Sequence, residues 1–101
     1  DGILPATWSH ANPVDIIGDA PTTRYVESLE ILAADPQIDA LLFIHAPTAI
    51  VDSTSIAHTC APMLRDWAAP VFSCWLGGNA VVCLFSSRYA SRATAYLPIP
   101  R

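Results

Sequence analysis

The chain has 101 residues, of which 52% are hydrophobic and 14% are charged, and its formal net charge is −4. This length and apolar content predict one small folded domain and exclude an intrinsically disordered chain, which would be rich in charge and poor in apolar residues. All five basic residues are arginines, which excludes Walker-type phosphate loops and pyridoxal Schiff bases, and the acidic balance predicts no nucleic-acid partner.

The cysteines and the apolar runs bear on compartment and membrane association. Cys60, Cys74 and Cys83 are odd in number and form no CxxC pair, so neither a disulfide framework nor a zinc motif is predicted. The longest apolar runs, 40–44 and 80–85, are far shorter than the roughly 20 residues that span a bilayer. The N-terminus also lacks a secretory signal pattern. We therefore expect a cytoplasmic protein with no membrane association.

The first predicted elements are a short extended segment and a helix. Residues 14–17 read as extended and end at Gly18. Thr22 or Thr23 is the expected N-cap of a helix that runs to about Ala34. One face of this helix is apolar, at positions Tyr25, Val26, Leu29, Leu32 and Ala33. This pattern predicts a helix that lies on a core and exposes its other face.

A buried strand and a second helix follow. The continuous apolar run from Ala40 to Ile44 predicts a strand that is buried on both faces of a parallel sheet. The next helix is expected to begin at Ser53 or Thr54. Its apolar positions recur at three- and four-residue steps, at Ile56, Ala57, Cys60, Met63, Leu64 and Trp67. Pro62 costs a regular helix roughly 3 kcal/mol, so one kinked helix and two shorter helices both remain open.

The last third of the chain repeats this alternation. The pattern predicts a second buried strand over residues 70–76, a tight turn at Gly77-Gly78, a third helix over residues 79–87 and a last strand over residues 94–97. Strands and helices that alternate with short connections specify a mainly parallel sheet flanked by helices. The predicted fold is a small flavodoxin-like α/β domain over residues 1–101.

Two turns at the predicted carboxyl ends of strands are candidate anion sites, because helix N-termini there direct free N–H groups toward a ligand. The first turn is residues 45–50, and the second is formed by Gly77, Gly78 and Asn79 with Ala80. Neither turn contains a phosphate motif such as GxGxxG. Plain connection between elements is therefore the alternative interpretation of both.

Isolated polar residues give weaker signals. His45, at a strand end, is a candidate acid–base group or phosphate acceptor, or else a histidine that bonds the neighbouring backbone. His58 and Cys60 diverge on a helix and have no ligand spacing, so no metal site is expected. Asp15 and Asp19 flank a glycine and are either ordinary turn formers or residues that orient a partner or a cation. The residues alone point to no reaction, and no catalytic residue is assigned.

Four stretches of sequence carry a resemblance to a known family: Trp8 to Pro21, Arg24-Tyr25, Asp35 to Asp52, and Pro70 to Gly78. Together they resemble the NDP-forming acyl-CoA synthetases. More narrowly, they are similar to the flavodoxin-like domain that corresponds to the C-terminal domain of the succinyl-CoA synthetase β subunit. The resemblance covers about three-quarters of the chain in unbroken order.

The resemblance implies a reaction in which acyl-CoA, phosphate and a nucleoside diphosphate are interconverted with acid, CoA and a nucleoside triphosphate through a phosphohistidine. It implies CoA, nucleotide and magnesium for the whole enzyme, and no cofactor held by this domain alone. The implied partners are CoA-binding, phosphohistidine and ATP-grasp domains, in the same chain or a partner chain, without which the isolated chain is inactive. In this family the domain offers a helix N-terminus to the phosphohistidine loop, and the matching positions here are Pro47, Thr48, Ala49 and Ile50.

Residues 79–101 form an atypical tail, because the family continues as a charged helix whereas residues 67–101 contain no acidic residue. The apolar segment 81–85 predicts burial by a partner, such as an oligomer contact, and a reading-frame slip near residue 80 is a further hypothesis. Related domains also occur in fusions with a lysine N-acetyltransferase. The alternative function is therefore a non-catalytic regulatory or assembly module, and a flavin-binding protein is the third, by fold analogy alone.

Overall fold

The computed structural model describes residues 2–76 and 93–97, in which helices and parallel strands alternate. The elements are α1 (Thr22–Ala33), β1 (Leu41–His45), α2 (Ser53–Arg65), β2 (Val71–Leu76) and β3 (Ala93–Leu97). The predicted turn at Gly77-Gly78, the predicted third helix and most of the atypical tail lie outside the described residues.

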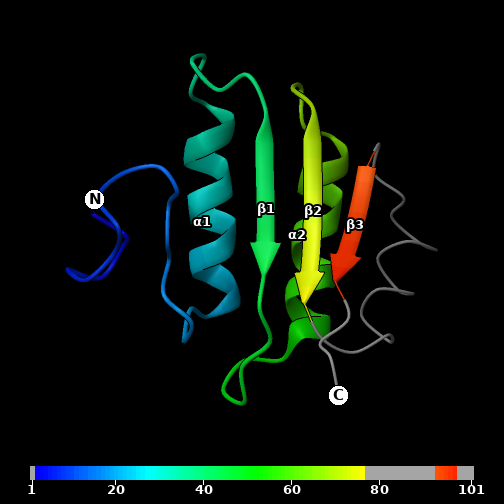
Figure 1. The fold of residues 1–101 in the computed structure, drawn as a ribbon. Helices are drawn as coiled ribbons and strands as arrows, with labels where there is room; N and C mark the ends of the chain where they lie inside the picture. The colour runs from blue at the N-terminus through cyan, green and yellow to red at the C-terminus, as the bar shows by residue number, and fades with distance from the viewer. Residues whose placement is uncertain (1, 77–92, 98–101) are drawn as a thin grey trace.

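The three strands form one parallel sheet in the order β1-β2-β3, and their arrows point the same way in Figure 1. Leu41 pairs with Val71 at the start of β1, and His45 pairs with Trp75 at its end. Parallel neighbours need a crossover connection, which α2 supplies between β1 and β2. These observations confirm the predicted small α/β fold with a parallel sheet flanked by helices.

The core lies between the sheet and the two described helices, which contact each other. Its buried members are Leu29, Leu41, Phe43, Ile56, Ala57, Cys60, Ala61, Leu64, Val71 and Trp75. The α2 members recur at three- and four-residue steps, whereas the strand members recur every second residue, so each element turns one face to the same cluster. Both helices therefore cover one face of the sheet.

The other face of the sheet is apolar but exposed, which contradicts the prediction of a strand buried on both faces. Burial alternates strictly along β1, where Leu42 is 63% exposed and Ile44 is 58% exposed. Phe72 on β2 is 51% exposed and completes this outer sheet face. An apolar run shows that both faces of a strand are apolar, but it does not show that a second layer covers the outer one.

The two helices begin in different ways. The N-cap of α1 is Pro21, which makes no side-chain cap bond, so the predicted threonine cap is wrong. Proline is compatible with this position because an N-cap residue has extended backbone, and Pro21 has φ −67° and ψ 160°. By contrast, α2 begins at Ser53, as predicted, and Pro62 lies in the last turn of one helix of 13 residues. Neither α1 nor α2 is long and apolar enough to cross a lipid bilayer.

Candidate functional site

Three parts of the chain lie together at the carboxyl ends of the strands. The β1–α2 loop (residues 46–52) follows β1, and the start of α1 and the turn before it lie at the same end of the sheet (Figure 1). Ligands of open parallel sheets bind at this carboxyl edge. The first predicted anion turn is therefore placed where such a fold positions a site.

The four predicted phosphate-binding positions, Pro47, Thr48, Ala49 and Ile50, all lie in the β1–α2 loop. Thr48 is partly buried and the other three are exposed. Because α2 begins only at Ser53, these positions lead to the helix N-terminus and do not form it, which corrects that part of the prediction. Their contact with a phosphate stays a prediction.

The N-terminus of α2 is occupied by the chain's own carboxylate. Asp52 accepts hydrogen bonds from the backbone N–H of Ser55 at 3.0 Å, from the Ser55 hydroxyl at 2.8 Å and from the Thr54 N–H at 3.4 Å. These bonds, above all that of the Ser55 hydroxyl, hold the pKa of the Asp52 carboxyl below its usual value. An anion at the first amides of α2 would meet this negative charge. The amides of the preceding loop are therefore the better donors to a phosphate.

His45 is buried at the end of β1 and joins two helices. Its side chain is 3% exposed. The Nε2 atom lies 2.9 Å from the Ser53 hydroxyl, and the Nδ1 atom lies 3.2 Å from the Tyr25 hydroxyl. Burial lowers the pKa of the His45 imidazole, which favours the neutral ring. Both partners are side chains and not the neighbouring backbone, and the buried ring is poorly placed to accept a phosphate.

Thr48 connects the β1–α2 loop to the turn that precedes α1. A Cβ atom built on Gly18 would lie 3.6 Å from Cγ2 of Thr48, so the Thr48 side chain lies beside this turn. The Thr48 hydroxyl oxygen is buried and has no hydrogen-bond partner among the described residues. The loop thus lies beside the turn.

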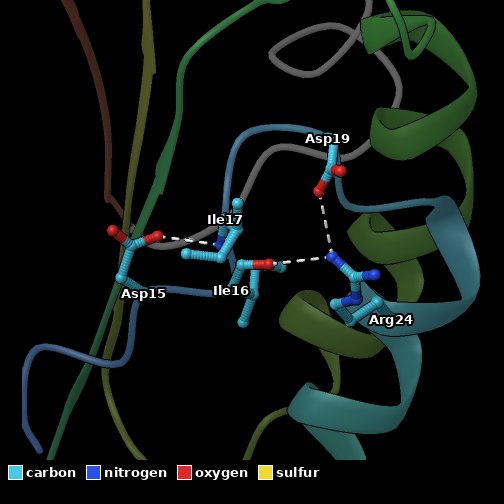
Figure 2. Close-up of polar contacts among 5 residues, drawn as sticks. All are labelled: Asp15, Ile16, Ile17, Asp19 and Arg24. Carbon is cyan, nitrogen blue, oxygen red and sulfur yellow. Dashed lines mark hydrogen bonds and ion pairs between the residues drawn. The ribbon is translucent and has the colours of Figure 1, made fainter. Parts of the chain in front are cut away.

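Side chains of Asp15 and Arg24 hold this turn in place (Figure 2). Asp15 accepts a hydrogen bond from the Ile17 N–H at 2.8 Å, and Arg24 donates to the Ile16 carbonyl at 3.2 Å and to Asp19 at 3.3 Å. The φ angle of Ile17 is 71°, a left-handed conformation that a β-branched residue rarely adopts. Both aspartates therefore act within this chain as turn formers. The predicted extended segment does not join the described sheet.

The remaining candidates do not gather into a site. His58 is exposed on α2, whereas Cys60 is fully buried on its other face, and burial raises the pKa of the Cys60 thiol to about 12. Within residues 2–76 and 93–97, no group of three histidine, cysteine or acidic side chains is placed to hold a metal ion. The second candidate turn, Gly77, Gly78 and Asn79, lies outside the described residues.

Sequence reasoning missed the roles of Tyr25, Asp52 and Ser53. The run of Asp52 followed by small hydroxyl residues is a recognisable N-cap signal and was available from the sequence. The pairing of Tyr25 with His45 was not, because the two residues are 20 positions apart and no local pattern connects them. An open groove of about 800 Å³ lies at the opposite end of the fold, beside Met63 and Trp67, and shares no residue with the β1–α2 loop.

Comparisons with known proteins find relatives of the same kind as the sequence resemblance. No protein-family model matches the chain. The ADP-forming acetate-CoA ligase I of Archaeoglobus fulgidus is 37% identical over 78 residues, which are 77% of this chain and 10% of that ligase. The ADP-forming 4-hydroxybutyrate-CoA ligase of Nitrosopumilus maritimus is 23% identical over 77 residues, which are 76% of this chain and 11% of that ligase.

Two solved structures of the dinucleotide forming acetyl-coenzyme A synthetase 1 of Ca. Korarchaeum cryptofilum have a similar fold. The apo form gives a TM-score of 0.76 at 27% identity and covers 96% of this chain and 21% of that one. The complex with phosphate and ADP gives a TM-score of 0.74 at 26% identity and covers 89% of this chain and 20% of that one. The chain thus spans about a tenth of the length of the curated relatives it matches. In sequence and in fold, the chain is similar to one segment of the ADP-forming acyl-CoA ligases.

Proposed function

We propose that the chain is one domain of an NDP-forming acyl-CoA synthetase, in which the β1–α2 loop contacts a phosphohistidine loop supplied by a neighbouring domain. The observation that carries the proposal is the 37% identity to an ADP-forming acetate-CoA ligase over 77% of the chain. The assembled enzyme would interconvert acyl-CoA, phosphate and a nucleoside diphosphate with acid, CoA and a nucleoside triphosphate. CoA, the nucleotide and magnesium would be held by other domains.

The geometry of the loop supports this role. Among the described residues, no hydrogen bond occupies the backbone N–H groups of Thr48, Ala49 or Ile50. Backbone N–H groups that are free of internal bonds remain available to donate to an anion. The loop also lies at the carboxyl edge of the sheet, where a neighbouring domain has access to it.

A chimaera tests the proposal. The matching 78 residues of the A. fulgidus ligase are replaced by the corresponding residues of this chain, and ATP formation from acetyl-CoA, ADP and phosphate is measured. We expect turnover by the chimaera and none by a control ligase in which a Gly/Ser linker of equal length replaces the segment. A chimaera that folds, assembles and has no turnover would refute the catalytic role.

Two variants of Thr48 in the same chimaera test the loop itself. Thr48→Pro deletes one backbone N–H and should slow turnover about tenfold or more, which is the scale of losing one donor to a reacting anion. Thr48→Ala retains the N–H and is the matched control, so it should stay close to the parent. Equal activities of the two variants would exclude a phosphate contact by this amide.

The second candidate function is a non-catalytic regulatory or assembly module, as in a fusion of a ligase-like part with a lysine N-acetyltransferase. The observation in its favour is the Asp52 carboxylate, which places a negative charge on the first amides of α2. A chimaera that assembles normally but forms no phosphohistidine-dependent ATP would favour this function over the first.

A further inference from the structure

The β1–α2 loop has few hydrogen bonds of its own. No backbone–backbone hydrogen bond outside helices and strands begins or ends within residues 46–51 of the described chain. A loop of this kind depends on what fixes its two ends. Those ends are His45, the last residue of β1, and Ser53, the first residue of α2.

These two end residues are bonded to each other. His45 Nε2 lies 2.9 Å from the Ser53 hydroxyl, so a side-chain hydrogen bond closes the loop at its base. On the other side of the ring, Nδ1 lies 3.2 Å from the Tyr25 hydroxyl of α1. The same helix carries Arg24, which holds the turn beside Thr48. The loop is therefore linked to α1 in two ways, by the bond of His45 to Tyr25 and by the turn beside Thr48 that Arg24 holds.

We propose that His45 is a positioning residue, whose imidazole links Tyr25 on α1 to Ser53 on α2 and thereby fixes the β1–α2 loop in the orientation that receives the phosphohistidine. The positioning of the loop stands on the contacts just described. Its catalytic consequence rests on the proposed function.

The chemistry of the imidazole suits this task. A neutral ring has one donor and one acceptor nitrogen on opposite sides, and each hydroxyl rotates to complement either tautomer. The ring is held by packing against Trp75, with centroids 4.9 Å apart, and against Tyr25, with centroids 6.0 Å apart. The lowered pKa of His45 keeps the ring neutral in this setting.

Four substitutions separate the links. Ser53→Ala and Tyr25→Phe each remove one hydroxyl and leave the ring in place, so both are expected to fold. His45→Phe removes both bonds, and His45→Gln retains an amide near the position of Nε2 and with it the bond to Ser53. Thr59→Ala, at an exposed position of α2, is the matched control for hydroxyl removal.

Hydrogen exchange of the 101-residue chain measures loop fixation without reference to catalysis. The amides of Ser55 and Ile56 donate to the side chain and the carbonyl of Asp52, the last residue of the loop. We expect these two amides to exchange about fivefold faster in Ser53→Ala and in Tyr25→Phe, which corresponds to the loss of one hydrogen bond each. His45→Phe should give a larger increase, His45→Gln a smaller one, and Thr59→Ala none. Unchanged exchange in both Ser53→Ala and His45→Phe would overturn the proposal.

Single-turnover kinetics of the chimaera measure the catalytic consequence. The rate constant for phosphoryl transfer from phosphohistidine to ADP, counted per phosphorylated enzyme, should fall about fivefold in Ser53→Ala, with an unchanged KM for acetyl-CoA. His45→Gln should restore part of the rate that His45→Phe loses. If the parent chimaera is active but these variants transfer at the parent rate, the positioning role is wrong and the proposed function stands. If the parent chimaera is inactive while exchange shows a loosened loop, the proposed function is wrong and loop fixation by His45 stands.

Discussion

His45 and Trp75 are register partners on neighbouring parallel strands, and the centroids of their rings lie 4.9 Å apart. The indole ring is among the largest fully buried side chains of the described core. The indole covers one side of the His45 imidazole, which would otherwise be hydrated at the carboxyl edge of the sheet. The contact makes the ionisation of His45 costly, because a charged ring would have to be stabilised beside apolar surface.

The stability of the chain should therefore decrease in mildly acidic solution. The folded pKa of His45 lies below the ordinary 6.5, so the unfolded chain binds more protons as the pH falls through 6.5 toward the folded value. The free energy of unfolding should fall in this window by at most about 1.4 kcal/mol per pH unit. Urea unfolding at a series of pH values measures this slope. His45→Gln should flatten this slope, and a variant that retains the parent slope would contradict the assignment.

Two isoleucines provide a matched test of the core. Ile56 on α2 is 1% exposed, whereas Ile31 on α1 is 57% exposed. Ile56→Ala should lower the free energy of unfolding by about 2–5 kcal/mol, because it removes buried methyl groups and leaves a cavity. Ile31→Ala should change it by no more than about 0.5 kcal/mol. Denaturant unfolding compares the two, and a similar loss in both would show that the packing of α2 on the sheet is wrong.

The two described cysteines should differ in reactivity. Cys60 is fully buried, and burial raises the pKa of its thiol to about 12, so almost no thiolate is present for alkylation at neutral pH. Cys74 is only partly buried. Iodoacetamide followed by peptide mapping should label Cys74 before Cys60, and Cys60 should react only after unfolding in concentrated urea. Rapid labelling of Cys60 in the folded chain would argue against its place in the core.

The turn before α1 should depend more on Arg24 than on Asp19. Arg24 donates to both the Ile16 carbonyl and Asp19, and the Asp19 side chain is 61% exposed. An exposed ion pair contributes about 0.2–1 kcal/mol, so Asp19→Asn should have little effect. Arg24→Ala loses both bonds and should accelerate exchange of the Ala20 amide, which is bonded to the Ile17 carbonyl. Equal exchange in the two variants would contradict the role of Arg24.

The element order was predictable because periodicity reports local burial. Apolar steps along residues 56–64 placed α2, and the run before His45 placed β1 to within one residue. The same run could not reveal that Leu42 and Ile44 are exposed, since sequence shows the polarity of a face and not what covers it. Thr22 is not the cap because it is already the first helical residue, so the extended Pro21 takes the cap position and makes no side-chain cap bond.

The candidate site was predictable in place but not in detail. A strand end followed by Pro47 located the β1–α2 loop, because parallel sheets carry their sites at this edge. The predicted start of α2 was also correct. The first amides of α2, however, donate to Asp52, so a helix N-terminus that would favour an anion carries a negative charge instead. The bonds of His45 to Tyr25 and Ser53 depend on how α1 packs beside β1, which no local pattern specifies.

The outer sheet face, formed by Leu42, Ile44 and Phe72, also determines how the chain behaves in concentrated solution. All three side chains are more than half exposed on adjacent strands, and such contiguous apolar surface promotes self-association. Sulfate strengthens apolar contacts because it is excluded from protein surfaces. The chain should therefore precipitate at a lower ammonium sulfate concentration than a double variant with Leu42→Thr and Phe72→Thr, as measured by turbidity. The same apolar run that forms β1 thus places apolar side chains on the exposed face of the sheet, and these side chains limit solubility.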